Sequence, residues 1–336
     1  MSVERVRVAL IGCGAWGSNI LRVLARSARA EVVAVADPLP HRRRSGGALV
    51  PRAALVSSLD EALDARPTAV LLATPAHSHA ALVLAALDAG VDVFVEKPLA
   101  LSTIDAERCA ARAAATGRVA MVGHLLRYHP TVRALLAHAE GGALGELLRF
   151  EAARLSVGGD RTAPALWTLG PHDLSVLQAL DPSPIRALSA QSPTSGDEAR
   201  VELSLASGLE ARVELSRAHA CKERKIAVIG DRGAAVFDDV RAPDRLLVGR
   251  ARRVGGELSI EIGGARPVPW EEPLALEIEH FLRCVAERAT PLTSFESGVP
   301  VVRALCRAEE AMTPPRAIGE LLAKGAEVEA RCHGGE

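Results

Sequence analysis

The sequence predicts an α/β protein whose N-terminal part is a doubly wound parallel sheet and whose C-terminal part is an α+β domain with an open, mostly antiparallel sheet. Up to Gly123, short apolar segments alternate with segments of helical periodicity, as βαβ units do. After Gly123 the segments become longer and amphipathic, and glycine-containing turns separate them. A length of 336 residues fits two domains, which we place at residues 1–123 and 124–336.

The first part contains six expected strands, and those with β-branched residues on both faces resemble buried parallel strands: 6–11, 32–36, 55–56, 69–73, 91–95 and 119–122. Helices are expected between them: 15–28, a short helix starting with capping-box spacing at Ser58, 79–88 and 102–117. Crossovers of this kind are right-handed, so the strands should form one doubly wound sheet.

In the second part, a helix at 130–139 precedes the expected strands: 147–157, 185–191, 201–206, 209–216, 225–229, 234–237 and 245–248. Gly208 and the turn at 230–233 are hairpin signals. Apolar stripes predict two closing helices, one through Leu274, Ile278, Phe281, Leu282 and Val285, the other through Val302, Leu305 and Met312. The join near residue 123 should form a cleft.

Composition excludes several classes of function. Forty Lys and Arg residues face 41 Asp and Glu residues, which argues against a bulk electrostatic grip on nucleic acid. The N-terminus lacks the apolar core of a signal peptide, and no apolar run reaches membrane-spanning length, so we expect a cytoplasmic protein with no membrane partner. The cysteines lie apart without metal-binding spacing and are expected to be free thiols, with no metal site: Cys13, Cys109, Cys221, Cys284, Cys306 and Cys332.

A glycine motif marks a dinucleotide site. Residues 12–17 have the pattern G-x-G-x-x-G between the first strand and the first helix. Gly12 permits the tight turn, Gly14 lets the backbone approach a pyrophosphate, and Gly17 allows close helix–strand packing. Ala15 and Trp16 lie at the helix N-terminus, whose free N–H groups and dipole favour phosphate. The first part is therefore expected to be a Rossmann domain.

Asp37 ends the second strand, twenty residues beyond Gly17. Its carboxylate should accept hydrogen bonds from the adenosine ribose and repel a 2′-phosphate, which favours NAD over NADP. The run at 42–44 consists of three arginines, which could instead hold a 2′-phosphate or lie in a solvated loop.

A second cluster follows the fourth and fifth strands, at the sheet edge where doubly wound folds bind ligands. Thr74, Pro75 and His79 follow the fourth strand, and Glu96 and Lys97 follow the fifth. In a cleft, Lys97 could stabilise alkoxide character during hydride transfer, although a surface loop lysine is the alternative. Glu96 could bind nicotinamide ribose hydroxyls or pair with Lys97.

Together, the glycine motif, Thr-Pro-x-x-x-His at 74–79, Glu-Lys-Pro at 96–98 and a later Gly-x-His resemble the glucose–fructose oxidoreductase/inositol dehydrogenase (Gfo/Idh/MocA) family. The resemblance implies an NAD(P)-dependent dehydrogenase or reductase of sugars and polyols, with Lys97–Pro98 in cis. It also implies cofactor contacts from the motif residues and His79, and oligomerisation as a homodimer or homotetramer through the C-terminal sheet.

The segments 123–130 and 165–175, with Arg154, resemble the nucleotide-sugar branch, which includes UDP-N-acetylglucosamine and UDP-N-acetylglucosaminuronate 3-dehydrogenases. Many family members carry Asp four residues before the active-site histidine, where this chain has Thr168. This resemblance implies that His172 is the catalytic partner of Lys97. It also implies a pocket for substrate, with these candidates: Arg127 (also a cofactor candidate), Tyr128, Arg154, Trp167, Thr168 and His172.

His172 follows Gly170 and Pro171, which resemble a helix start, where the dipole would keep the imidazole neutral and able to accept a proton. A capping or core histidine is the alternative. Arg127 and Arg154 suit a diphosphate or a carboxylate but could equally form interdomain ion pairs. His124 and His129 should flank the cleft. The competing functions are a dehydrogenase of free polyols or monosaccharides and a non-catalytic NAD-sensing protein.

Overall fold

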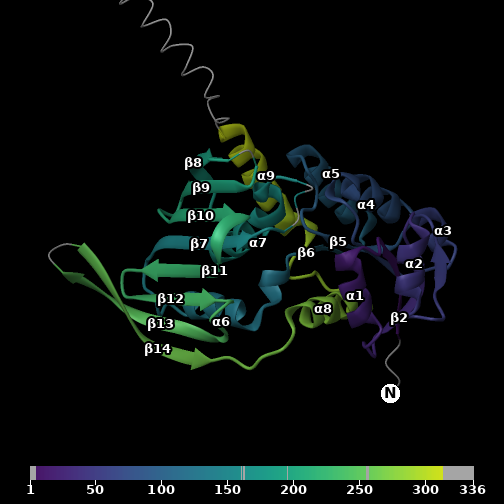
Figure 1. Ribbon diagram of the computed structural model, residues 1–336, viewed down its shortest axis with the longest axis horizontal. Helices are drawn as coiled ribbons and strands as arrows, with labels where there is room; N and C mark the ends of the chain where they lie inside the picture. Colours follow the sequence, from purple (N-terminus) through teal and green to yellow (C-terminus); the bar gives the residue numbers. More distant parts are fainter. Residues whose placement is uncertain (1–4, 160, 162, 195, 255–256, 313–336) are drawn as a thin grey trace, which may run out of the picture.

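The computed structural model describes residues 5–312 except 160, 162, 195 and 255–256. Its elements fall into two sheets with separate helical layers (Figure 1). Cys332 lies outside the described residues, and the other five cysteines are free thiols.

The six strands of the first sheet lie in the order β3-β2-β1-β4-β5-β6, all parallel. Their bounds are β1 (Val6–Ile11), β2 (Ala30–Ala36), β3 (Ala54–Val56), β4 (Ala69–Leu72), β5 (Asp92–Glu96) and β6 (Ala120–Gly123). The helices are α1 (Ala15–Leu24), α2 (Pro40–Gly47), α3 (Leu59–Leu63), α4 (His79–Asp88) and α5 (Thr103–Thr116), with the 3-10 turn η1 (Ala76–Ser78). The predicted doubly wound parallel sheet is confirmed.

Caps explain several of these helix boundaries. Ser58 and Ser102 each accept a hydrogen bond from a first-turn N–H, and Gly117 ends α5 with φ of 60°. One predicted boundary was wrong, because the first helix ends at Leu24 instead of continuing to residue 28. The arginines at 42–44, for which a solvated loop was one alternative, lie in α2, which begins at Pro40.

The second sheet has eight strands in the order β14-β13-β12-β11-β7-β10-β9-β8. Their bounds are β7 (Leu147–Val157), β8 (Ile185–Gln191), β9 (Glu198–Leu205), β10 (Glu210–Ser216), β11 (Ala218–Gly230), β12 (Gly233–Asp238), β13 (Ala242–Val254) and β14 (Glu257–Pro267). All neighbours are antiparallel except β10 and β7, which confirms the mostly antiparallel prediction. The exposed edge strand β14 was not predicted, although Leu258, Ile260 and Ile262 alternate with polar residues; none of its residues is fully buried.

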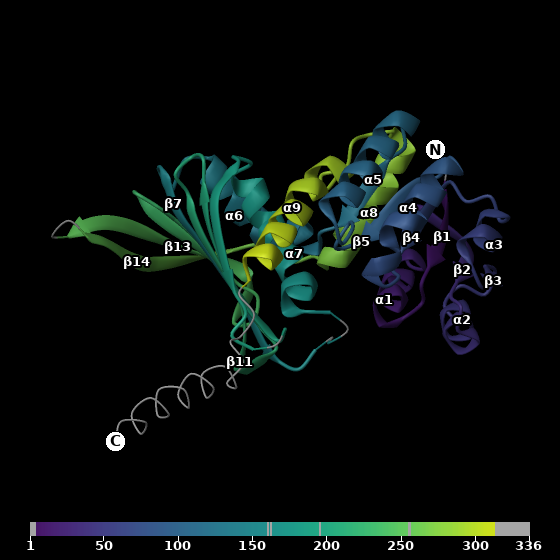
Figure 2. The ribbon, with the colours of Figure 1, turned by 90° about the horizontal axis from the view of Figure 1, so that it is seen from above.

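The remaining helices are η2 (Leu125–Tyr128, a 3-10 turn), α6 (Pro130–Glu140), α7 (Ala165–Leu180), α8 (Pro273–Glu287) and α9 (Phe295–Ala311). In Figure 2, α6, α7 and α9 lie on one face of the eight-stranded sheet, and their apolar side chains share a core with it. Helix α8 returns to the first sheet, where Ile278 and Phe281 pack in one cluster with Val8 and Phe94.

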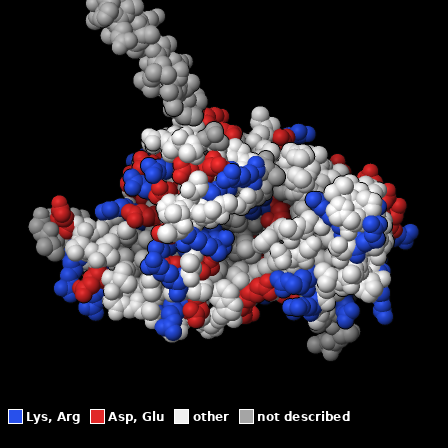
Figure 3. Space-filling view, in the orientation of Figure 1, with Lys and Arg blue, Asp and Glu red and all other residues white. Residues whose placement is uncertain are grey.

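Side chains of both charges are interspersed over the face shown in Figure 3, in keeping with the net charge of -1. Within the described residues, no helix combines the length and the apolar character that crossing a bilayer requires.

Candidate active site

The loop between β1 and α1 is shaped to receive a phosphate-bearing ligand. A Cβ on Gly12, whose φ is +90°, would lie 2.5 Å from the Ala73 oxygen, and a Cβ on Gly17 would lie 2.0 Å from the Gly12 oxygen. These two glycines are therefore required by packing. Gly14 differs, because a Cβ there would meet nothing nearer than Arg42 Nη1 at 3.9 Å. Helix α1 begins behind this open space with no side-chain cap, so its first N–H groups fit a pyrophosphate.

Asp37 follows β2 and is buried beside the glycine loop. Its Oδ2 accepts from the Cys13 N–H at 2.9 Å, and its Oδ1 accepts from the Leu39 N–H at 2.9 Å. Because each carboxylate oxygen can accept a second hydrogen bond, these contacts fix the side chain and leave capacity for ribose hydroxyls. Arg43 donates to the Asp37 carbonyl at 2.6 Å, so this arginine is held by backbone oxygen.

A cavity of about 750 Å³ opens where the carboxyl ends of β4, β5 and β6 meet α7. It brings together residues from the glycine loop, from both predicted strand-end clusters and from the second part of the chain. The lining residues are Trp16, Ala73, Thr74, Pro75, Ala76, His77, Glu96, Lys97, Pro98, Leu101, Gly123, Leu125, Ala163, Trp167, Thr168 and His172. Of these, Leu101 and Ala163 lie outside the segments that the sequence singled out, since an isolated apolar residue gives no sequence signal.

Lys97 connects the two parts of the chain. Its Nζ donates to the Thr168 carbonyl oxygen at 2.8 Å. Thr168 and His172 are four residues apart in α7 and therefore lie on one face of that helix. The ammonium group consequently lies beside the turn that carries the imidazole. The Lys97–Pro98 peptide bond is cis, as the resemblance implied.

The predicted helix start at Gly170–Pro171 was wrong. Helix α7 begins at Ala165, and Pro171 lies inside it, so the N-terminal dipole does not act on His172. Burial is instead the main cause that lowers the pKa of His172 well below its usual value, followed by the positive charges of Lys97 and Arg154. The ring is therefore neutral at pH 7 for a different reason from the one expected.

Two buried acidic residues act on each other electrostatically: Glu96, which lines the cavity, and Glu277 of α8. Trp16 Nε1 donates to Glu96 Oε1, and burial raises the pKa of Glu96 to about 7 against the opposing effect of Lys97. Neither carboxyl oxygen of Glu277, on α8, has a hydrogen-bond partner among the described residues. Burial and the neighbouring Glu96 raise the pKa of Glu277 well above its usual value. Sequence reasoning missed Glu277, although it stands one position before Ile278 on the apolar stripe of its helix.

His79 lies behind the cavity wall. Its Nδ1 is 2.7 Å from the Pro98 oxygen and its Nε2 is 2.9 Å from the Thr74 oxygen. The ring thus ties the loop after β4 to the loop after β5, and burial lowers the pKa of His79. His79 thus lies near the predicted cofactor site but is not among the residues that line the cavity.

Three predicted substrate residues point elsewhere. Tyr128 is buried in the core, with its hydroxyl 3.0 Å from Thr293 Oγ1. Arg154 forms a buried bidentate pair with Asp173, with N–O distances of 3.0 and 2.9 Å. Arg127 Nη1 donates to the Ser175 oxygen at 3.4 Å.

Two further predicted positions behave differently. Trp167 does line the cavity, and its Nε1 donates to Glu309 at 2.9 Å. His129, expected to flank the cleft, caps α6 through Nδ1 and lies 3.5 Å from Asp239. In the described part of the chain, no group of three or more His, Cys, Asp or Glu residues could hold a metal ion.

Comparison with known proteins agrees with this geometry. Residues 6–124 match the Gfo/Idh/MocA profile, described as an oxidoreductase family with an NAD-binding Rossmann fold. Inositol 2-dehydrogenase 4 of Saccharopolyspora erythraea is 34% identical over 161 residues, or 46% of this chain and 46% of that protein. The chain thus matches less than half the length of this curated relative.

Two solved structures are similar over most of the chain. A protein of Magnetospirillum magnetotacticum MS-1 with a provisional oxidoreductase assignment is 33% identical, with a TM-score of 0.79 over 90% of this chain and 99% of that chain. UDP-N-acetylglucosamine 3-dehydrogenase from Acidithiobacillus ferrooxidans is 24% identical, with a TM-score of 0.81 over 92% and 98% of the two chains, and shares the fold. Residues 6–124 therefore belong to the Gfo/Idh/MocA oxidoreductase family, and the N-terminal sheet is the NAD-binding Rossmann fold of that family.

Proposed function

We propose that this protein is an NAD-dependent oxidoreductase that interconverts a secondary alcohol and a ketone on a sugar ring. One observation carries the proposal: Lys97 and His172, 75 positions apart in the sequence, line the same cavity. The hydrogen bond from Lys97 to Thr168 holds the ammonium group beside the face of α7 that carries His172. A neutral imidazole can accept the proton of an alcohol, and a cation beside it can stabilise the negative charge that develops on the oxygen.

The cofactor would lie along the carboxyl edge of the first sheet. The first-turn N–H groups of α1 and the open face of Gly14 would hold the pyrophosphate, and Asp37 would accept from the adenosine ribose. Trp16, Thr74, Pro75 and Glu96 would border the nicotinamide end. Bound NAD would supply the ring that accepts the hydride.

The chain's own residues would handle the proton. His172, being neutral, would accept the hydroxyl proton of the substrate. Lys97 would donate a hydrogen bond to the same oxygen and stabilise its developing negative charge. In the reverse direction His172 would return the proton to the alkoxide oxygen.

The proposed substrate is a nucleotide sugar oxidised at its 3-position. Support comes from the fold shared with UDP-N-acetylglucosamine 3-dehydrogenase and from the Pro-His-Asp-x-Ser segment at 171–175. A free polyol is the second candidate, and two observations favour it. Curated relatives include inositol 2-dehydrogenases, and Arg127 and Arg154, the residues expected to bind a diphosphate, are engaged by protein groups.

A substrate panel tests the proposal. Purified protein with NAD⁺ is incubated with UDP- and dTDP-sugars, inositol and glucose, and the absorbance of NADH is followed. Lys97→Ala should lower kcat by about 10²- to 10⁴-fold while NADH binding is retained. Lys222→Ala, which removes an exposed lysine from β11, is the matched control. Turnover of no sugar, with NAD bound, would favour the alternative of a non-catalytic NAD-sensing protein.

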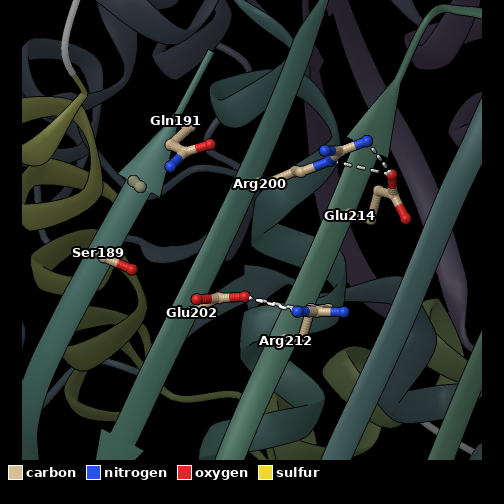
Figure 4. A pocket seen from close by; sticks show the side chains of 7 residues that line it. Ser189, Gln191, Arg200, Glu202, Arg212 and Glu214 are labelled. Carbon is tan, nitrogen blue, oxygen red and sulfur yellow. Dashed lines mark hydrogen bonds and ion pairs between the residues drawn. The ribbon is translucent and has the colours of Figure 1, made fainter. Parts of the chain in front are cut away.

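We also propose that the protein self-associates through its second sheet. The face of β8, β9 and β10 that points away from α7 and α9 is lined by polar side chains from all three strands (Figure 4). Two ion pairs lie across it, Arg200 with Glu214 and Arg212 with Glu202. Such a pattern can complement itself across a two-fold axis. We propose in addition that the chain divides into two domains at residue 123 and that the protein is cytoplasmic.

A further inference from the structure

His124 stands at the same level as Lys97 on the edge of the first sheet. Glu96 and Gly123 are paired in the parallel ladder of β5 and β6, so Lys97 and His124 are the next residues to leave these neighbouring strands. Gly123 and Lys97 both line the cavity. His124 therefore lies next to a cavity-lining residue, between the end of β6 and the turn η2.

The side chain of His124 is 2% exposed, and neither ring nitrogen has a hydrogen-bond partner among the described residues. Leaving a buried polar atom unpaired costs about 1–3 kcal/mol, so the unpaired nitrogens of this ring destabilise the fold and need another explanation. Burial, together with the charges of Arg127 and Lys97, lowers the pKa of His124 to about 3. The ring is therefore neutral and keeps one nitrogen lone pair free to accept a hydrogen bond.

His172 has a matching unpaired atom. Its Nδ1 is buried and lacks a partner within the described part of the chain. The groups that act electrostatically on this ring are Lys97, Arg154, His124 and Arg224. Three of them are cations without a lone pair, so among these neighbours only His124 can accept a hydrogen bond. Helix α7 also packs on the turn that follows His124, where Arg127 donates to Ser175.

We propose that His124 is a positioning residue that accepts a hydrogen bond from Nδ1–H of His172 through one bridging water, since the two rings are not bonded to each other directly. This contact fixes the His172 tautomer whose Nε2 is unprotonated and faces the substrate. The inference rests on the proposed function for its chemical purpose, because only a base at Nε2 can take the hydroxyl proton. No step transfers a proton to His124 itself.

The tautomer can be measured without cofactor or substrate. Long-range ¹H–¹⁵N spectra of ¹⁵N-histidine-labelled protein, with the His172 signals assigned through His172→Asn, should show the proton on Nδ1. His124→Phe keeps a flat ring but removes the acceptor, and should convert the His172 signals to the Nε2–H form or to a mixture. His124→Asn, which restores an acceptor oxygen, should return them. If His124→Phe does not yield folded protein, His124→Leu, which also lacks the acceptor, should change the His172 signals in the same way.

Kinetics separate this inference from the proposed function. His124→Phe should lower kcat at least tenfold with KM for NAD⁺ changed less than twofold, and His124→Asn should recover most of kcat. His138→Phe, on α6 and outside the cavity lining, is the matched control. An unchanged His172 tautomer in His124→Phe would overturn the inference even in an active enzyme. If the wild type oxidises no sugar, yet His124→Phe changes the His172 tautomer as expected, the proposed function alone would be overturned.

Discussion

At the scale of single residues, some buried ionisable side chains have a partner of opposite charge and others have none among the described residues. Arg154 and Asp173 are both buried and bind each other through two hydrogen bonds, so neither is left uncompensated. Glu277 has no such partner in the described residues, and its neighbour Glu96 is also acidic. Two buried carboxylates cannot both ionise cheaply, so burial and the neighbouring Glu96 both favour the protonated form of Glu277.

This arrangement predicts a pH dependence of stability. Because the folded pKa of Glu277 lies well above the unfolded value near 4.5, the folded state holds a proton that the unfolded state loses above that pH. The free energy of unfolding should therefore fall as the pH rises above about 4.5, by at most about 1.4 kcal/mol per pH unit for this group. Glu277→Gln, which cannot ionise, should remove this slope and stabilise the protein most at pH 8.

Urea unfolding between pH 5.5 and 8 measures the effect. Glu279→Gln, on the same helix but with a side chain 41% exposed, is the control and should keep the wild-type slope. Equal slopes for wild type and Glu277→Gln would show that Glu277 is already ionised in the folded protein.

At the scale of elements, the glycine loop has two kinds of glycine that the motif alone does not distinguish. Gly12 and Gly17 are in contact with backbone atoms, whereas the space at Gly14 is open. The first kind is required by the fold, and the second leaves room for a ligand. A substitution at Gly17 should therefore lower the stability of the fold, whereas one at Gly14 should weaken ligand binding.

Gly17→Ala should lower the free energy of unfolding by about 1–3 kcal/mol, because its Cβ would lie 2.0 Å from the Gly12 oxygen. Gly14→Ala should cost less than about 1 kcal/mol, since its φ of -71° suits alanine. Its methyl group would nevertheless occupy the space proposed for the pyrophosphate and weaken NADH binding at least tenfold. Thermal unfolding and NADH fluorescence titration of both variants test this, and tight NADH binding by Gly14→Ala would contradict the proposed site.

At the scale of the whole molecule, the two sheets are joined through α8 and α9. Arg288, just after α8, contacts the buried Asp92 of β5 at 2.6 Å. Val299 and Val302 of α9 pack with the core of the first sheet, while Val301 and Leu305 pack with that of the second. The cavity lies at this junction, so its two walls are held in place by segments at the end of the described chain.

At this scale, the proposed self-association through the outer face of the second sheet can be tested by reversing charges on that face. If copies associate through it, Arg212→Glu should place like charges next to Glu202 and weaken self-association at least tenfold. The double variant Glu202→Arg/Arg212→Glu should restore it. Sedimentation equilibrium measures both dissociation constants, and a wild-type protein that is monomeric at 100 μM, roughly the upper range for weak association, would exclude this interface.

The sequence by itself determined the order and type of most elements and the glycine loop, because these depend on local periodicity and turn chemistry. It also indicated, by resemblance, that Lys97 and His172 share a site. Local patterns were misleading at Pro171, since proline favours a first turn but is also tolerated inside α7, where tertiary packing holds the helix.

Only the tertiary structure decided which polar side chains reach the cavity. Tyr128, Arg154 and Arg127 have the chemistry of a substrate pocket but are engaged by Thr293, Asp173 and Ser175. Glu277 and His124 are buried without such partners in the described chain. A side chain's partners come from elements distant in the sequence, and burial and pairing set its charge, so neither can be obtained from the neighbouring residues alone.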